Sequence, residues 1–387
     1  MRSRVAGVAD TLAIIGAHLP RELVDEPALR RAAAACSGLP AVLTKWIYFE
    51  CRLRGSPRVD LVLEVDRVGR SVLAGDNPAV ALPARYARTY PWNRVCELCA
   101  EWGRPEGQLA RAVHHIWLEL DVPVARRRRR SGPAAPGVFV CFGETAPPAG
   151  GAAAWLDSAR EAVRCLTGAR PEGEQDRALA RCFARLPHGA HVPYVGVMLQ
   201  RPGRAIRLCV RGLMRRDLPA YLEAIGWPGP LRELDALLAG LGGAQPARRV
   251  GMLHVDVGDG VHPRLGFEYA LDRKAQLARR LREQAFLNRL VRRGLCSAAK
   301  RDALGAWPGA TVVSLPHQLW RTVVQRRVNH VKIVYEPGRG IVAKAYLCAA
   351  LGARNRRGVV RFERPGPCGA PAAGQASPWH EPSAPSL

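Results

Sequence analysis

Five times along this chain, two short β-prone segments lie close together, and charged residues occupy alternate positions within them. Repetition of one structural unit constrains a fold more than any single motif. The five predicted hairpins begin at Lys45, His114, Val192, Val250 and His330. Apolar segments with helical periodicity separate the hairpins, so the expected order is helix, two strands and two helices, repeated until the last hairpin closes the series.

The segments between the hairpins predict helices that end at turn signals. We expect helices over 8–36 with a break near Pro20, 78–102 with an interruption near Pro91, 152–167, 176–186, 217–225, 231–241, 274–293 and 297–304. The similar tetrapeptides GWPG at 226–229 and AWPG at 306–309 each follow a predicted helix. Their recurrence supports a repeated unit.

Each hairpin can be divided into two faces, because successive side chains of a strand point to opposite sides. One face is apolar, as with Val331, Ile333 and Leu347 in the last hairpin. The other face is polar or aromatic and carries Trp46, Tyr48, Glu50, His115, Trp117, Glu119, Arg207, Cys209, Arg211, His254, Asp256, Arg264, Glu268, His330, Lys332, Lys344 and Tyr346. We expect helices to cover the apolar face.

Two arrangements of these strands explain the alternation. An open antiparallel sheet with one wet face needs no functional site at all. A closed barrel would gather the polar faces around a cavity, and ten strands are wide enough to close. We favour the barrel because aromatic residues lie among the charges and because an open sheet leaves long unprotected edges. The predicted fold is therefore α+β: five αββα units that form a ten-stranded antiparallel barrel with helices outside, in one domain over 1–361.

The formal charge of +25 attracts anions in general, such as phosphate esters, nucleic acid or acidic peptides. A GC-rich genome also produces this composition, since Arg, Ala, Gly and Pro are abundant together while Lys is scarce. The eleven cysteines are scattered along the chain and do not resemble a disulfide framework, which favours the reducing cytoplasm. No segment is apolar for the length of a membrane span. Residues 362–387 are rich in Pro, Ala and Ser, a composition typical of disorder.

The segment HVKIVYEPGRGIVAKAYL, at 330–347, resembles the strand pairs of indole prenyltransferases, in which Lys and Tyr alternate as KxY. The motif here is Lys344-Ala345-Tyr346. Together with the five hairpins flanked by helices, it gives the chain a resemblance to the ABBA prenyltransferases, whose fold is the PT barrel. The resemblance covers nearly the whole chain in topology.

This resemblance implies roles for residues on the polar faces. Cationic and tyrosine side chains of the barrel would hold a prenyl diphosphate: Arg207, Arg211, Lys332, Lys344, Tyr346 and, less closely matched, Arg264. Glu50 is the first candidate and Glu119 the second for a carboxylate that orients or deprotonates an aromatic or peptide acceptor. Tyr48 and Trp117 would line the apolar part and shield the allyl cation. The implied reaction needs no obligatory metal and no cofactor, and it belongs to natural-product or peptide modification.

The sequence also departs from that family. KxY occurs once, in the last hairpin, and the third hairpin carries Arg-x-Cys-x-Arg instead. The alternative is a non-catalytic barrel that binds an anionic peptide, a metabolite or nucleic acid. Arg126 to Arg130 could contact phosphates, but no helix-turn-helix, RNP-type or zinc module accompanies them. No acidic DDxxD-type run is present that would bind magnesium as isoprenoid synthases do.

Two further patterns are weak signals for a metal. Cys96 and Cys99 form a CxxC with no second pair at zinc-finger spacing, which favours buried structural thiols. His188 and His191 flank a loop before a predicted strand, without an acidic or cysteine partner nearby. We therefore expect no metal site.

Overall fold

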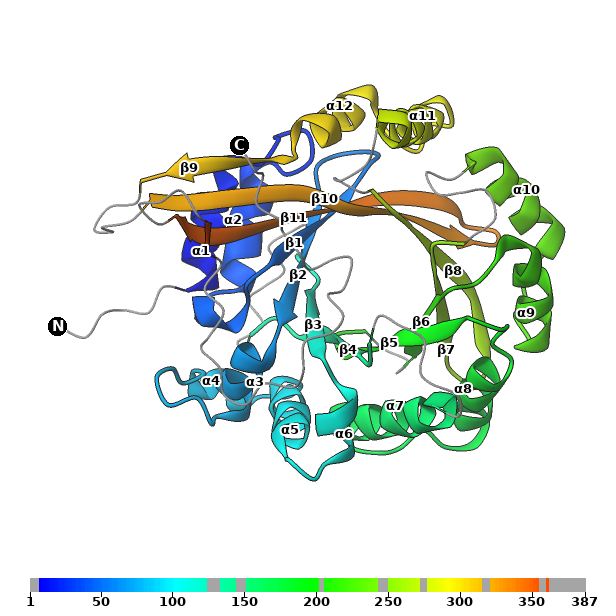
Figure 1. Cartoon of the computed structure of the whole chain (residues 1–387), viewed down its shortest axis with the longest axis horizontal. Helices are drawn as coiled ribbons and strands as arrows, with labels where there is room; N and C mark the ends of the chain where they lie inside the picture. The colour runs from blue at the N-terminus through cyan, green and yellow to red at the C-terminus, as the bar shows by residue number, and fades with distance from the viewer. Residues whose placement is uncertain are drawn as a thin grey trace.

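The computed structural model describes residues 7–123, 133–143, 151–201, 205–242, 250–271, 277–314, 321–354 and 360–361. Ten of its strands close into one antiparallel barrel, seen from the end in Figure 1. In barrel order they are β1 (Ile47–Arg52), β2 (Val59–Val65), β3 (His115–Leu120), β4 (Pro136–Cys141), β5 (His191–Met198), β6 (Ile206–Arg211), β7 (Met252–Val257), β8 (Val261–Ala270), β10 (Arg321–Glu336) and β11 (Gly340–Arg354). Since β11 pairs with both β10 and β1, the ring has no open edge. The closed barrel is confirmed and the open sheet is wrong.

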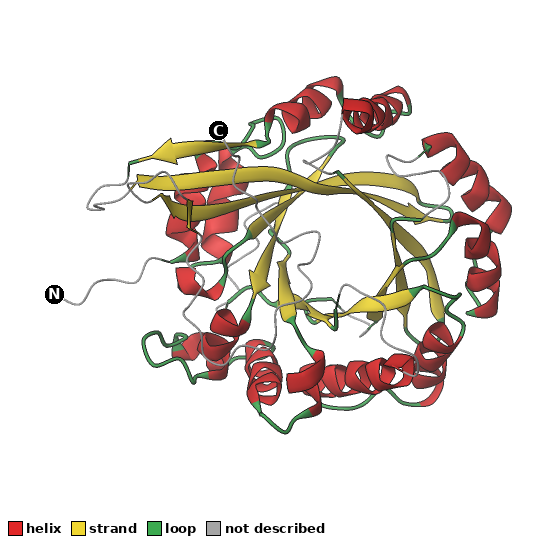
Figure 2. Cartoon of the chain, in the orientation of Figure 1, coloured by secondary structure: helices red, strands yellow, loops and turns green. Residues whose placement is uncertain are grey.

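Helices surround this ring, as Figure 2 shows. They are α1 (Val8–Gly16), α2 (Glu26–Ala35), α3 (Arg67–Ala74), α4 (Ala84–Ala87), α5 (Trp92–Gly103), α6 (Gln108–Ala112), α7 (Gly151–Thr167), α8 (Gly173–Ala184), α9 (Leu218–Ala224), α10 (Leu231–Leu241), α11 (Leu277–Arg292) and α12 (Ala298–Ala306). Short 3-10 turns lie at Ala41–Leu43 and Arg215–Asp217. The predicted interruption near Pro91 is present, because α4 ends before it and α5 begins just after it.

Several elements were not predicted from the sequence, among them α3, α6 and two short strands. Asp66 caps the start of helix α3, since its side chain accepts hydrogen bonds from the backbone of Val68 and Gly69. Gly75 caps the end of the helix in the left-handed region, with φ 81°. These are ordinary cap signals at both ends of a helix. The strands β9 (Gly309–Val313) and β12 (Val360–Arg361) pair with β10 and β11 beyond the ring. They exist because β10 and β11 are each far longer than the other strands of the barrel.

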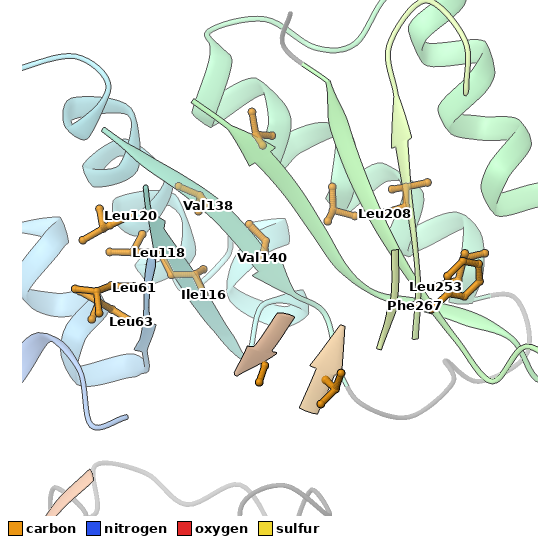
Figure 3. Close-up of a cluster of buried hydrophobic side chains, with 14 of the residues drawn as sticks. Leu61, Leu63, Ile116, Leu118, Leu120, Val138, Val140, Leu208, Leu253 and Phe267 are labelled. Atoms are coloured by element: carbon orange, nitrogen blue, oxygen red, sulfur yellow. The ribbon is translucent and has the colours of Figure 1, made fainter. Parts of the chain in front are cut away.

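The apolar face of the strands lies against the helices, as predicted. Figure 3 shows part of this core, with side chains from six strands: Leu61, Leu63, Ile116, Leu118, Leu120, Val138, Val140, Leu208, Leu253 and Phe267. All of them are fully buried and belong to one continuous cluster with helical residues such as Trp92 and Leu98. Burial of each such side chain contributes about 1.5–3 kcal/mol. The opposite strand face therefore points into the barrel, and we call it the inner face.

The tryptophans of the two WPG segments have the same structural role. Trp227 follows α9, and its indole Nε1 donates to the carbonyl of Pro263 in β8 at 3.0 Å. Trp307 follows α12 in the same way, and its Nε1 donates to the carbonyl of Arg327 in β10 at 2.9 Å. Both rings are buried. Each tryptophan thus fixes the end of an outer helix to a barrel strand.

Candidate functional site

The structure places every predicted site residue on the inner face. Their sequence neighbours, such as Phe49, Leu118 and Leu208, belong to the helix-covered core, so the intervening side chains point the other way. We divide the inner face into two halves. The ionic half comprises Glu50, Arg207, Cys209, Arg211, His254, Asp256, Arg264, Glu268, His330, Lys332, Lys344 and Tyr346. The aromatic half comprises Trp46, Tyr48, Glu64, His115, Trp117, Phe139, Cys141, Tyr194 and Met198.

The KxY motif meets Glu50 within the ionic half. Glu50 lies opposite Tyr346 in the β1–β11 pairing and is 4% exposed. It accepts hydrogen bonds from the Lys344 ammonium and from the Tyr346 hydroxyl. Burial alone would raise the pKa of Glu50, but the charge and hydrogen bond of Lys344, with the hydrogen bond of Tyr346, lower it below its ordinary value. Glu50 is therefore a carboxylate that holds two predicted donor-site residues in place.

A second group surrounds Lys332. Its Nζ lies 3.0 Å from Nδ1 of His254 and 3.5 Å from the Glu268 carboxylate. Nε2 of the same imidazole lies 2.6 Å from Glu268. Burial, followed by the Lys332 charge, lowers the pKa of His254 to about 4, so the ring is neutral at neutral pH. His330 extends the group, since its Nε2 lies 3.4 Å from Glu268 and its ring stacks on Tyr346 at 4.1 Å between centroids.

The remaining cations of the ionic half lie on β6 and β8. Arg207 is 7% exposed and makes a two-pronged ion pair with Asp256, at 2.6 and 2.9 Å. Burial would raise the pKa of Asp256, but the hydrogen bonds and charge of Arg207 lower it. Arg264 makes no ion pair within 4 Å in the part of the chain that the structure describes. Burial and the repulsion of Arg207 lower its pKa, and burial lowers that of Arg211.

The sequence analysis did not identify Arg201 as part of this site. Arg201 follows β5 and contacts the end of β3, where it lies 3.0 Å from Glu119 and 2.8 Å from Asp121. No local signal could have found this contact, because the two strands are joined through other elements and the partners are about 80 positions apart. Glu119, the second candidate for the acceptor carboxylate, is thus paired with a cation.

The aromatic half forms a continuous wall from β1 to β5. The ring of Trp117 packs edge-on against Tyr48, at 4.7 Å between centroids, and against His115, at 5.3 Å. Phe139 lies over Gly196 of the neighbouring strand, where a Cβ atom would fall 2.5 Å from the phenyl ring. Glycine at that position therefore leaves the space that the ring fills.

Two carboxyl groups of β2 were also missed, the buried Glu64 and the half-buried Asp60. Burial, followed by the Asp66 carboxylate, raises the pKa of Glu64 to about 7. Burial, followed by the Glu50 carboxylate, raises the pKa of Asp60 to about 7. The Tyr48 hydroxyl lies 3.5 Å from Glu64, which faces Trp117 across the β2–β3 pairing. The segment VDLVLEV contains both residues at alternate positions, so its pattern could have identified them.

Most predicted donor-site cations already have a carboxylate partner. Lys344 contacts Glu50, Lys332 contacts Glu268, and Arg207 contacts Asp256. An ion pair in a nearly buried site keeps both side chains charged and holds them in fixed positions. An anionic ligand in this half must therefore share these cations with the carboxylates or displace them.

The other sequence patterns do not add to this site. Cys96 and Cys99 both lie on α5, and burial raises the pKa of each thiol. His191 begins β5 and packs near Trp155, 6.0 Å away between ring centroids. Across the described ranges, no three His, Cys, Asp or Glu side chains are grouped so as to hold a metal ion. Arg126 to Arg130 and the tail at 362–387 lie outside the described residues.

No described helix has the length and apolar character needed to cross a membrane. Comparison with known proteins finds no matching family model and no matching curated protein. Solved structures do match. The apo form of prenyltransferase PriB is 17% identical, covers 88% of this chain and 96% of its own, and has a TM-score of 0.49. The 5-dimethylallyltryptophan synthase from Streptomyces coelicolor is 16% identical over 88% and 95% of the two chains, also with a TM-score of 0.49.

A third match is the 6-dimethylallyltryptophan synthase from Micromonospora olivasterospora, solved with DMASPP and Trp. It is 16% identical over 78% of this chain and 81% of its own, with a TM-score of 0.46. At such identities the likeness concerns the fold and not the activity. The predicted fold does not depend on these matches, because the strand order of the chain itself shows a closed ten-stranded antiparallel barrel with helices outside it.

Proposed function

We propose that this protein is a prenyltransferase-like enzyme that moves an allylic group from a prenyl diphosphate to an aromatic or peptide acceptor, without an obligatory metal. The observation that carries the proposal is the division of the inner face. Arg and Lys side chains on β6, β8, β10 and β11, of which Arg207 and Lys332 are buried and the others half-buried, face the same interior as an aromatic wall on β1 to β5. An allyl transfer needs both surfaces at once.

The ionic half suits the departure of diphosphate. When the carbon–oxygen bond of the donor breaks, the electron pair leaves with the diphosphate, and preorganised cations stabilise the charge that develops. We assign this role to Arg207, Arg211, Arg264, Lys332, Lys344 and Tyr346. Arg264 supports the assignment most simply, because it has no competing ion pair among the described residues.

The aromatic half suits the carbocation and the acceptor. The faces of Tyr48 and Trp117 can stabilise an allyl cation through cation–π attraction. Glu50 and Glu119 then orient the acceptor ring through their carboxylates. The new carbon–carbon or carbon–heteroatom bond takes two electrons from the acceptor, which afterwards loses a proton. The proposal treats 1–361 as one domain that works in the cytoplasm.

One observation favours a second function. Because Arg207, Lys332 and Lys344 are each paired with a carboxylate, the interior carries much less free positive charge than its cations alone suggest. That balance stabilises a leaving diphosphate less than unpaired cations would. A non-catalytic barrel, which binds an anionic peptide or metabolite without having to stabilise a leaving group, is therefore the alternative. Nucleic acid would require contacts outside the barrel, and the arginine run that could supply them lies outside the described residues.

Product formation tests the proposal. Purified protein is incubated with dimethylallyl diphosphate and a panel of indoles, phenols and aromatic peptides, and products are identified by mass spectrometry. We expect an alkylated acceptor from the wild type and its loss in Lys344→Ala and Arg207→Ala. Arg30→Ala, which changes an exposed ion pair on α2, is the control and should keep full activity. Tight diphosphate binding without any alkylated product would favour the non-catalytic barrel.

A further inference from the structure

Cys209 lies where the two halves of the inner face meet. In the strand pairings it is opposite Tyr194 of β5 and His254 of β7. On the β5 side it belongs to the apolar cluster that contains Phe139 and Met198. On the β7 side its Sγ lies 3.3 Å from Nδ1 of His254. The thiol therefore contacts the aromatic half and the ionic half at once.

The imidazole of His254 is oriented as a base toward this thiol. Its Nε2 lies 2.6 Å from Glu268. Burial alone would raise the pKa of Glu268, but its imidazole and lysine neighbours hold it well below its ordinary value, so the carboxylate accepts and Nε2 donates. Nδ1 therefore carries the lone pair and faces Sγ of Cys209. Thiol, imidazole and carboxylate thus follow one another as a nucleophile, its base and the group that orients the base.

The close packing around His254 depends on a glycine. Gly266 lies opposite His254 in the β7–β8 pairing, and a Cβ atom there would fall 3.1 Å from Cβ of His254 and 3.0 Å from Cε of Lys332. Glycine therefore leaves the space in which both side chains lie. The Lys332 ammonium lies 3.0 Å from Nδ1, so it shares this nitrogen with the thiol.

The thiol is protonated at rest and lies between two cations. Burial raises the pKa of Cys209, and the Lys332 charge opposes that shift only in part. The thiol therefore becomes a strong nucleophile only when a base takes its proton. Arg207 and Arg211 flank Cys209 at alternate positions of β6, so all three side chains are on the inner face. A thiol between two arginines assigned to the diphosphate is close to the carbon that the diphosphate leaves.

We propose that Cys209 is a site of self-modification, at which the thiol takes the allylic group of a prenyl diphosphate when no acceptor is bound. This inference rests on the proposed function, because it uses the same donor. The sulfur–carbon bond forms as the carbon–oxygen bond of the donor breaks. The diphosphate leaves with the electron pair of that bond, and the thiol proton passes to Nδ1 of His254. A diphosphate that engages Lys332 also frees Nδ1 for this transfer. The product is a stable thioether, which leaves an apolar group at the junction of the two halves.

Peptide mapping by mass spectrometry tests the inference. The full chain is incubated with dimethylallyl diphosphate in the absence of any acceptor, and the adduct is located among the cysteines. We expect a dimethylallyl thioether on Cys209 and none on Cys141, which lies in the same apolar cluster but bonds to Tyr194 and not to an imidazole. Iodoacetamide, which alkylates thiols without a diphosphate, forms the second arm.

Two variants assign the reaction to the pair of thiol and imidazole. His254→Gln should form the adduct on Cys209 about tenfold to a hundredfold more slowly, because the base is lost. Cys141→Ala is the matched control, since it removes a thiol from the same cluster, and it should react at Cys209 as the wild type does. Melting curves of both variants check that the barrel is folded.

An adduct spread evenly over the cysteines overturns the inference, as does a rate at Cys209 that is unchanged in folded His254→Gln. An unmodified Cys209 in a protein that alkylates an acceptor overturns it too, and the proposed function then stands. Failure of the proposed function looks different: iodoacetamide labels Cys209 in a manner that depends on His254, but dimethylallyl diphosphate yields neither the adduct nor an alkylated acceptor, and the inference falls with the donor site.

Discussion

The two halves of the inner face accommodate buried ionisable side chains in different ways. Both come from strands that alternate apolar and polar residues, and both are nearly buried. In the ionic half, charges are kept by pairing, as in Glu268 with His254 and Lys332. In the aromatic half, rings fill the space and the carboxyl group of Glu64 has its pKa raised instead. The difference teaches that pairing between strands, and not the pattern within a strand, decides which buried groups carry charge.

Removal of one partner from the ionic half should give the largest effect. Glu268→Ala leaves Lys332 buried beside two imidazoles without its carboxylate. We expect a loss of about 3–5 kcal/mol in the free energy of unfolding, measured by denaturant titration. Asp302→Ala breaks an exposed ion pair on α12 and serves as the control, with no measurable change expected. Equal stability of Glu268→Ala and the control would show that the ionic network is not buried as described.

In the aromatic half, a change in side-chain volume should lower the stability of the protein. Gly196→Ala introduces a methyl group that collides with the Phe139 ring, and we expect a loss of about 1–3 kcal/mol. The double variant Gly196→Ala with Phe139→Leu should lose less than the sum of the two single variants, because the second change makes room for the first. Gly305→Ala in α12 meets nothing within 4 Å and should be neutral or slightly stabilising. Additive losses in the double variant would contradict the packing of Phe139 on Gly196.

The two halves should respond oppositely to pH, and the net effect is the smallest of the three because the two contributions oppose each other between about pH 4.5 and 6.5. The pKa of Glu64 is raised from 4.5 to about 7, so the folded protein holds a proton between these values that the unfolded chain has lost. Stability contributed by Glu64 therefore falls as pH rises through that window, by at most about 1.4 kcal/mol per pH unit. The pKa of His254 is lowered from 6.5 to about 4, so its contribution rises with pH between about 4 and 6.5.

Unfolding titrations at several pH values separate these two contributions. Glu64→Gln should remove the fall between about pH 4.5 and 7, and His254→Gln should remove the rise between about pH 4 and 6.5. Stability curves of Glu64→Gln that run parallel to the wild type would mean that Glu64 is ionised in the folded protein, as it is in the unfolded chain.

Much of this architecture could be predicted from the sequence, because it depends on local periodicity. Alternation alone placed residues as far apart as Glu50 and Tyr346 on one face, and closure of the ring brought them together. Contacts that depend on distant segments could not be predicted. Arg201 reaches Glu119, and Lys300 of α12 donates to the carbonyls of Arg52 and Gly55, with no local signal for either contact. The first of these contacts pairs the predicted carboxylate Glu119 with a cation that the sequence pattern did not identify.

Binding of inorganic diphosphate to Asp256→Asn tests the central claim most directly. If the ionic half holds the diphosphate of a prenyl donor, Asp256 competes with it for the fork of Arg207. Calorimetry should then show tighter binding to Asp256→Asn than to the wild type, and binding at least tenfold weaker to Arg207→Ala. Unchanged affinity in both variants would contradict the account, because the diphosphate would then bind away from the barrel interior.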